Sequence, residues 1–215
     1  MLVSLRDVRA GYGGRAAVRL AQLDIAAGEH TLLLGPSGCG KTTLLNVIAG
    51  IAPVMSGEVR INGELLGAMG ESARDRFRGA NIGLIMQRLH LIGALSVEAN
   101  LKLAQSLAGR TVDATRIQAV LTSLGVAHKT ASKPREISQG EAQRVAIARA
   151  VINHPPLIIA DEPTSALDDA SCEAAIGLLM EQAMQHGATL LVATHDARIK
   201  ARFSRIVDLG QTGDA

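Results

Sequence analysis

The sequence predicts an α/β fold in which a parallel sheet forms the core, an antiparallel β subdomain comes first, and a helical subdomain is inserted between the strands. Three observations predict this fold. Short apolar runs alternate with helical patterns, which is typical of parallel sheets with crossover helices. The N-terminal strands are broken by a glycine-rich turn at residues 11–14, and a long later stretch has apolar spacings of three and four, which indicate helices.

The N-terminal part of the chain is predicted to be β-structure. Partly alternating strands are expected over Leu2–Val8 and Ala17–Ile25, on either side of the turn at residues 11–14. A further strand pair is expected over Ser56–Leu66, because Asn62-Gly63 is a strong signal for a tight hairpin turn.

The remaining strands are continuous apolar runs, which is typical of strands buried on both faces of a parallel sheet. They are predicted over His30–Leu34, Asn81–Met86, Leu157–Ala160 and Thr189–Ala193. Helices are predicted over Thr42–Ala49 and Ala170–His186, and the stretch from Ser96 to Ala150 is mainly helical. No internal repeat or linker interrupts the pattern, so residues 1–215 are expected to form one domain, with the helical subdomain at about 88–153.

Composition excludes several classes of protein. Hydrophobic residues make up 47% of the 215 residues and aromatics 1%, so an aliphatic core is expected. The net charge of +2 gives no basic face for a nucleic acid, and no nucleic-acid partner is expected. Cys39 and Cys172 do not make a disulfide framework or a metal site. No secretory signal is expected, and the apolar runs are shorter than the roughly 20 residues that span a bilayer, so a membrane role would need a partner.

A glycine-rich loop carries the clearest chemical signal. It fits the pattern G-x-x-x-x-G-K-[ST], follows an apolar strand and opens a helix, and it consists of Gly35, Pro36, Ser37, Gly38, Cys39, Gly40, Lys41 and Thr42, with Thr43 next in the helix. Glycines let successive N–H groups point at phosphate oxygens, and the helix N-terminus adds positive charge. Lys41 can reach the terminal phosphates of ATP, and Thr42 can ligate Mg²⁺. This predicts a P-loop NTPase core; the alternative is an ordinary glycine-rich turn.

Two acids end the buried strand at 157–160. The strand delivers Asp161 to the carboxyl edge of the sheet, where nucleotides bind in such folds. Asp161 can hold Mg²⁺ through water, and Glu162 can polarise the water that attacks the γ-phosphate. Acids at a solvated sheet edge are the alternative explanation, which the nearby phosphate loop makes weaker.

The segment 137–141 precedes a strong helical run. Ser138 is a good N-cap, and Glu141 three residues later completes a capping box. The helix N-terminus with the Gly140 amide can also meet a phosphate. Periodicity alone favours the capping interpretation.

Taken together, the motifs resemble those of the nucleotide-binding subunits of ATP-binding cassette (ABC) transporters, over nearly the whole chain. In the family's order they are the phosphate loop at 35–42, Gln87, Ile-Ser-Gln-Gly-Glu at 137–141, Asp161-Glu162-Pro163, Ser165-Ala-Leu-Asp168 and Thr194-His195-Asp196. The resemblance implies an ATPase that binds ATP and Mg²⁺ and works with an integral membrane permease. It also implies a location on the cytoplasmic face of the inner membrane.

The resemblance further implies individual roles. Tyr12 matches the aromatic residue that stacks on adenine, and Gln87 the residue that contacts Mg²⁺ and the attacking water in a loop facing the permease. Asp168 matches a loop acid that links two cassettes, and His195 the histidine that contacts the γ-phosphate. In the family two cassettes sandwich two ATP molecules, so the Ser138 segment of one subunit faces the phosphate loop of the other.

One motif departs from the family pattern. The usual signature is Leu-Ser-Gly-Gly-Gln, whereas Ile137, Gln139 and Glu141 replace three of its positions here. Ser138 and Gly140 remain, so we still expect the two cassettes to close around ATP. The stretches 73–87 and 90–101 are most similar to the lipoprotein-release and macrolide-export branch.

Other ATPases and phosphate-loop enzymes are the alternatives. Soluble cassette proteins of repair or translation usually carry two cassettes or long coiled-coil insertions, and neither is present. A GTPase should show Asn-Lys-x-Asp, and no asparagine here is followed by lysine. A small-molecule kinase would not need the Ser138 and His195 segments.

Overall fold

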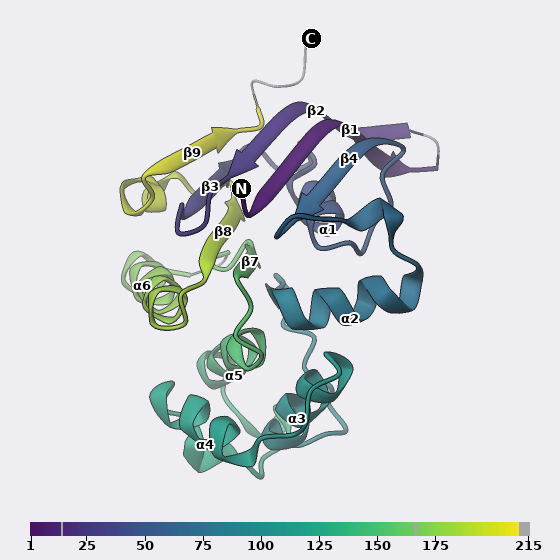
Figure 1. Cartoon of the computed structure of the whole chain (residues 1–215). Helices are drawn as coiled ribbons and strands as arrows, with labels where there is room; N and C mark the ends of the chain where they lie inside the picture. The colour runs from purple at the N-terminus through teal and green to yellow at the C-terminus, as the bar shows by residue number, and fades with distance from the viewer. Residues whose placement is uncertain (14, 166, 211–215) are drawn as a thin grey trace.

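The computed structural model describes residues 1–13, 15–165 and 167–210, except for the side chain of Tyr12. Four strands form an antiparallel sheet in the order β2-β1-β4-β5, near the N-terminus in Figure 1. They are β1 (Val3–Tyr12), β2 (Arg15–Ile25), β4 (Ser56–Ile61) and β5 (Glu64–Leu65). Asn62 and Gly63 join β4 to β5 with φ angles of 50° and 84°, so the predicted hairpin turn is confirmed.

The second sheet is parallel, with the strand order β6-β7-β8-β3-β9. Its strands are β3 (Thr31–Leu34), β6 (Ile82–Ile85), β7 (Leu157–Asp161), β8 (Thr189–Thr194) and β9 (Arg205–Asp208). All residues of β3, β7 and β8 are buried, which explains their unbroken apolar runs. The predicted combination of a parallel core sheet and an antiparallel N-terminal sheet is confirmed.

Six α-helices accompany the sheets within the described residues. They are α1 (Lys41–Ile48), α2 (Glu71–Asn81), α3 (Val97–Leu107), α4 (Ala114–Ser123), α5 (Gln139–Val151) and α6 (Asp169–Gln185). Short 3₁₀ turns lie at Leu66–Ala68, Ala127–Lys129, Pro134–Glu136 and Ala197–Arg202. Helices α3, α4 and α5 lie at the end of the molecule opposite the antiparallel sheet (Figure 1), within the range expected for a helical subdomain. Its bounds near 88 and 153 stay a prediction.

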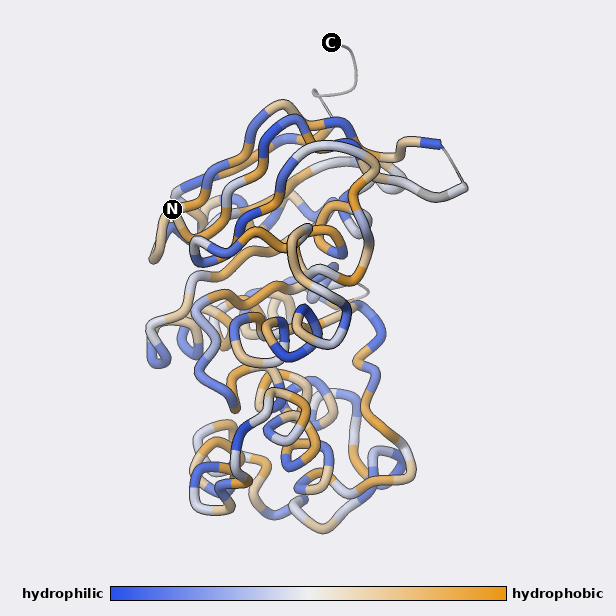
Figure 2. Tube along the Cα trace, turned by 45° about the vertical axis from the view of Figure 1, so that its right-hand side comes forward, coloured by the Kyte–Doolittle hydropathy of each residue, from blue (hydrophilic) through white to orange (hydrophobic). Residues whose placement is uncertain are grey.

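Two hydrophobic cores lie on the two faces of the parallel sheet. Helix α1 packs between the two sheets. Leu33 of β3 belongs to the core that lies there, together with apolar residues of α1 and of the antiparallel sheet. The alternate residues Leu32 and Leu34 join the other core, which α3 to α6 cover. Figure 2 shows hydrophobic residues gathered along these strands.

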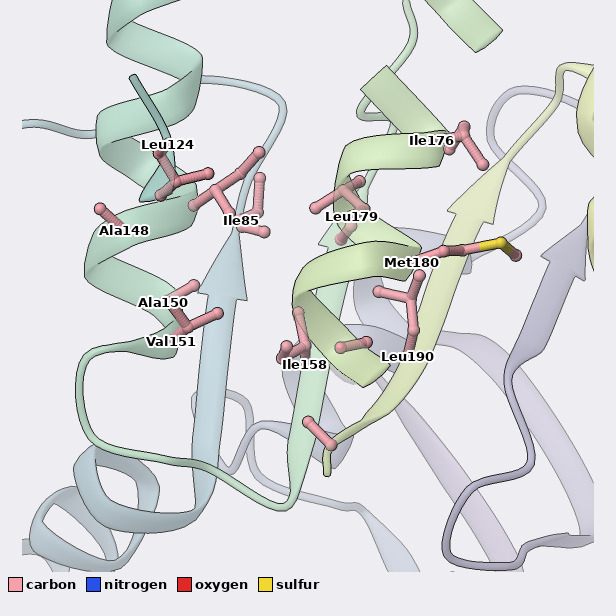
Figure 3. Packing of buried hydrophobic residues seen from close by; sticks show 14 of the residues in the cluster. Ile85, Leu124, Ala148, Ala150, Val151, Ile158, Ile176, Leu179, Met180 and Leu190 are labelled. Atoms are coloured by element: carbon pink, nitrogen blue, oxygen red, sulfur yellow. The ribbon is translucent and has the colours of Figure 1, made fainter. Parts of the chain in front are cut away.

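Helices α5 and α6 close the second core. Figure 3 shows their apolar side chains directed at the strands between them. The residues labelled there are Ile85, Leu124, Ala148, Ala150, Val151, Ile158, Ile176, Leu179, Met180 and Leu190. These two helices are therefore fixed against one face of the parallel sheet.

Two elements were not predicted. Helix α2 buries none of its residues, so it lacks the apolar stripe that reveals a helix, and Asn81 ends this helix instead of starting the next strand. Strand β9 alternates half-buried and exposed residues and is held by pairing with β3. Among the described residues, no helix combines the length and the apolar content that a membrane span requires.

Candidate active site

The phosphate loop connects buried strand β3 to helix α1. Gly38 and Gly40 have φ angles of 83° and 98°, in the left-handed region that favours glycine. A Cβ on Gly40 would lie 2.6 Å from Val18 Cγ2 and 2.7 Å from the Ala17 oxygen, so no side chain fits there. Strand β2 thus packs directly behind the loop, whose residues Pro36, Ser37 and Gly38 are exposed.

Lys41 lies inside the loop, with a relative exposure of 5%. Its Nζ donates to the carbonyl oxygens of Gly35, at 2.7 Å, and Pro36, at 3.0 Å. The same Nζ lies 3.4 Å from Glu162 Oε1. The lysine is therefore held by neutral acceptors and one carboxylate, at the position from which it can meet a bound phosphate.

Thr42 and Asp161 form the second pair of the site. Thr42 Oγ1 donates to Asp161 Oδ2 at 2.8 Å, while the buried Asp161 Oδ1 has no hydrogen-bond partner within the described chain. Burial raises the pKa of Asp161, and the charge of Glu162 adds to the increase. An orphaned carboxylate oxygen beside a hydroxyl is a donor set that suits a hard cation such as Mg²⁺.

Glu162 has a strained backbone and a well-defined set of partners. Its φ of 48° is uncommon outside glycine, and its amide donates to the Ala193 oxygen at 2.8 Å. Thr194 Oγ1 donates to Oε2 at 2.8 Å, and His195 Nδ1 lies 3.1 Å from both carboxylate oxygens. Burial opposes ionisation, but these contacts outweigh it and lower the pKa of Glu162. The carboxylate is therefore charged at neutral pH and aimed by two neighbours.

Thr194 is a site residue that the sequence analysis quoted in the motif Thr194-His195-Asp196 but gave no role. The register of the parallel strands pairs Asp161 with Ala193, so the next residues, Glu162 and Thr194, meet at the carboxyl ends of β7 and β8. A buried strand that ends in a threonine beside the acidic strand is the signal that could have found it.

A second set of contacts fixes the loop after Glu162. Arg198 donates to both oxygens of Asp196, at 2.7–3.1 Å, and to the Leu167 oxygen at 3.3 Å, and it also pairs with Asp169. Arg198 lowers the pKa of Asp196 to about 2. Asp196 follows His195 directly, so the His195 turn and the start of α6 are joined through one guanidinium. Sequence reasoning missed Arg198, since no motif includes it.

Gln87 lies beyond the end of β6 and is exposed. It lines a hollow of about 60 Å³ together with Glu162, Pro163 and Gln139. Gln143 Nε2 donates to the Pro163 oxygen at 3.2 Å, which ties α5 to the acidic loop. The structure thus places Gln87 and Glu162 in the wall of one hollow, and the expected contact of Gln87 with Mg²⁺ and the attacking water stays a prediction.

Ser138 caps helix α5 as the sequence predicted. Its Oγ accepts from the Glu141 amide at 3.3 Å, and Glu141 Oε2 accepts from the Ser138 amide at 2.8 Å. The Ser138 amide and hydroxyl lower the pKa of Glu141 to about 2. Ser138 and Gly140 are exposed, and none of the Ser138 hydrogen bonds goes to the phosphate loop of the same chain.

Three residues that the sequence analysis named as site candidates have not yet been placed in the structure. Asp168 caps α6, where the Ser171 amide donates to it at 2.9 Å, and it is exposed. Thr43 is buried in α1. The side chain of Tyr12, at the end of β1, lies outside the described residues, so the expected adenine contact stays a prediction.

Comparisons with known proteins agree with this geometry. The family model described as ABC transporter matches residues 18–165. The lipoprotein-releasing system ATP-binding protein LolD of Chromohalobacter salexigens is 38% identical over 88% of the chain and 81% of its own length. The macrolide export ATP-binding/permease protein MacB of Escherichia coli O157:H7 is 36% identical over 97% of the chain, which spans 33% of that longer protein.

Solved structures share the fold. The dimeric post-hydrolysis structure of the ATP-binding cassette MJ0796 bound to ADP and Pi has a TM-score of 0.85 at 32% identity, over 97% of this chain and 95% of that one. The structure of cbiO1 from Clostridium perfringens, part of the ABC transporter complex cbiONQ, has a TM-score of 0.84 at 25% identity, covering 97% and 85%.

Proposed function

Since this chain belongs to the ABC transporter family, we propose that it binds and hydrolyses ATP in order to drive transport through a separate membrane permease. The observation that carries the proposal is the convergence of Lys41, Thr42, Asp161, Glu162 and His195 at one edge of the parallel sheet. These residues come from three strand ends, and each supplies a different part of phosphoryl-transfer chemistry.

The phosphate loop binds the nucleotide. Its exposed glycine-rich backbone presents N–H groups at the start of α1, and the helix dipole favours the phosphate charge there. Lys41 exchanges its carbonyl acceptors for the terminal phosphates, a stronger charge-assisted contact. Thr42 and Asp161 are the residues that would hold Mg²⁺; when bound, the ion would neutralise charge on the phosphates. The resemblance to the family adds Gln87 to this set.

Glu162 orients and deprotonates the attacking water. Its charge at neutral pH suits it to accept a proton, and Thr194 holds one of its oxygens in place. His195 lies against the same carboxylate and is itself about half exposed, so it can turn toward a γ-phosphate. The left-handed backbone of Glu162 aims the side chain back toward Lys41.

A second copy of the chain completes the site. One phosphate loop supplies donors on one side of the γ-phosphate, and the exposed start of α5 at Ser138 and Gly140 is a separate anion site. The MJ0796 cassette, which was solved as a dimer with ADP and Pi, supports this arrangement. The proposed assembly is a homodimer that encloses ATP between the two copies.

The permease is proposed to dock in a groove of about 560 Å³ between the core sheet and the helical segment. Apolar side chains lie at its rim: Ile51 is 49% exposed, Ile92 42% and Leu107 64%. Exposed apolar residues around a hollow mark interaction sites.

Arg149 of α5 lines the groove and donates to the oxygens of Leu89 and His90, so the segment after Gln87 is joined to the helix that Ser138 begins. A partner bound in the groove would therefore be coupled through Arg149 to both the segment after Gln87 and the helix that begins at Ser138. We place the chain at the cytoplasmic face of the membrane through this contact.

The experiment is phosphate release by the purified chain, alone and assembled with its permease in nanodiscs. The account predicts Mg-ATP hydrolysis that the permease stimulates. Leu107→Asp should weaken assembly and stimulation without changing the basal rate, whereas Met184→Asp, at an equally exposed apolar residue on α6, should change neither. ATP hydrolysis that no membrane protein stimulates would favour a soluble cassette ATPase instead.

A further inference from the structure

The backbone of Glu162 is in the left-handed region, with a φ of 48°, and this conformation directs its carboxylate into the site. A residue other than glycine keeps such a conformation only where its surroundings restrain the chain on both sides. On the side before it, Asp161 is the buried last residue of β7 and pairs in register with Ala193 of β8. The restraint on the other side has to come from contacts of the loop that follows Glu162.

That loop is held near both of its ends. At its start, Gln143 Nε2 donates to the Pro163 oxygen at 3.2 Å. At its end, Arg198 Nη2 donates to the Leu167 oxygen at 3.3 Å. Arg198 belongs to the 3₁₀ turn at Ala197–Arg202, which follows strand β8. The loop after Glu162 is therefore tied at its end to the turn that follows the neighbouring strand.

Arg198 also holds the residues that contact the Glu162 carboxylate. Its Nε donates to both oxygens of Asp196, at 2.9 and 3.1 Å, and its Nη2 donates to Oδ2 at 2.7 Å. The Asp196 amide donates to Thr194 Oγ1 at 3.0 Å, and that hydroxyl donates to Glu162. Asp196 also directly follows His195, the other residue in contact with the carboxylate. Because a planar guanidinium fixes direction as well as distance, one side chain sets the loop and the turn relative to each other.

We infer that Arg198 is a positioning residue for the proposed hydrolysis, which holds Glu162 in its left-handed conformation by joining the loop after it to the turn after β8. Arg198 acts through Asp196 and Leu167 and does not itself contact the carboxylate that receives the proton. The inference rests on the proposed function, since it assigns a role in the same reaction.

Arg202 provides a matched control in the same turn. It is 42% exposed and Arg198 is 44% exposed, and each pairs with an acid of α6, Glu173 and Asp169 respectively. Within the part of the chain that the structure describes, only Arg198 of the two also bonds to Asp196 and Leu167. Ion pairs this exposed contribute little to stability, so loss of either arginine should leave the fold intact.

The first arm of the test measures phosphate release by the purified chain over a range of ATP concentrations. Arg198→Gln should lower kcat at least about tenfold, because a small displacement of a catalytic group is costly. Its KM for ATP should stay within about twofold, since Arg198 is not part of the phosphate loop. Arg198→Lys keeps the charge beside Asp196 and should recover part of the rate, whereas Arg202→Gln should match the unmodified chain.

The second arm does not depend on hydrolysis. The Cα chemical shift of Glu162, which reports its backbone conformation, is measured by NMR in the ATP-free protein. It should move in Arg198→Gln and stay unchanged in Arg202→Gln. If the unmodified chain hydrolyses no ATP, the proposed function fails and this shift alone decides whether Arg198 holds Glu162. An unchanged Glu162 shift in Arg198→Gln, or a kcat equal to that of the unmodified chain where the latter is active, overturns the inference.

Discussion

Lys41 Nζ lies 3.4 Å from Glu162 Oε1, so the residue proposed to bind phosphate and the residue proposed to activate water contact each other. Their side chains are only 5% and 12% exposed, so solvent screens the pair little. A bound γ-phosphate would compete with Glu162 for Lys41. Binding would then release the carboxylate toward the attacking water, which links ATP binding to activation of the base.

Glu162→Gln should bind ATP and barely hydrolyse it. The amide keeps the shape and the hydrogen bond from Thr194, but it cannot accept the proton of the water. The loss of a general base typically slows the reaction by 10²–10⁴-fold. Steady-state phosphate release checks this, and a rate near that of the unmodified chain would remove Glu162 from the catalytic role.

Lys41→Ala should weaken ATP binding itself. The change deletes the cation aimed at the terminal phosphates and also the two hydrogen bonds that hold the Gly35 and Pro36 carbonyls. Titration with a fluorescent ATP analogue measures the affinity, and circular dichroism checks that the variant folds. Unchanged affinity would argue against the phosphate-loop assignment.

Cys39 should react with alkylating reagents in the ATP-free protein and be shielded by Mg-ATP. Its side chain is partly exposed in the phosphate loop. Cys172 is an internal control, because it is buried and burial raises the pKa of its thiol, so it should react slowly in both states. Mass spectrometry measures the labelling of each cysteine; equal labelling of Cys39 with and without Mg-ATP contradicts the prediction.

Folding stability should decrease as pH falls from 7.5 to 5.5. Partial desolvation lowers the pKa of His30, His154 and His186 below the usual 6.5, and the nearby charge of Arg116 adds to the decrease for His154 and His186. The unfolded chain therefore binds more protons in this window, and each histidine contributes a slope of up to about 1.4 kcal/mol per pH unit. His30 Nδ1 also accepts from the Leu190 amide at 3.1 Å, a bond that protonation abolishes.

Urea unfolding at several pH values measures this slope. His186→Gln should flatten it, whereas His128→Gln, whose imidazole is 61% exposed beside Glu141, should not. A slope that substitution of none of these three histidines changes would assign the effect to other groups.

Local patterns explain how much of the fold the sequence could predict. Strands β3, β7 and β8 are buried throughout, so each gives a continuous apolar run in the sequence. The phosphate loop needs glycines where φ is positive, so it gives a recognisable glycine pattern. Helix α2 and strand β9 give only weak sequence patterns, because neither has a continuous buried face.

The candidate site likewise contains parts that the sequence could predict and parts that it could not. The phosphate loop, the acids after β7 and the cap at Ser138 are local motifs, and they could be predicted. The contact between Thr194 and Glu162 depends on strand register, and the contact of Arg198 with Leu167 spans 31 residues of sequence. Such pairs depend on how the strands and loops pack together, so a local motif does not give the contact between their two residues.

ATP-driven dimer formation is the central claim. Ser138 and Gly140 are exposed at the start of α5, and their own chain does not bring Ser138 to its phosphate loop. If bound ATP joins the two copies there, its binding energy favours the dimer by linkage. ADP lacks the γ-phosphate and should not act in this way.

Sedimentation of Glu162→Gln with ATP, with ADP and without nucleotide tests this claim most directly. The account predicts a dimer with ATP and a monomer in the other two states. Adding Ser138→Arg should abolish the dimer, since a bulky cation then occupies the phosphate position, while Ser138→Thr keeps the hydroxyl cap and should preserve it. A Glu162→Gln protein that binds ATP yet stays monomeric at high concentration would contradict the account.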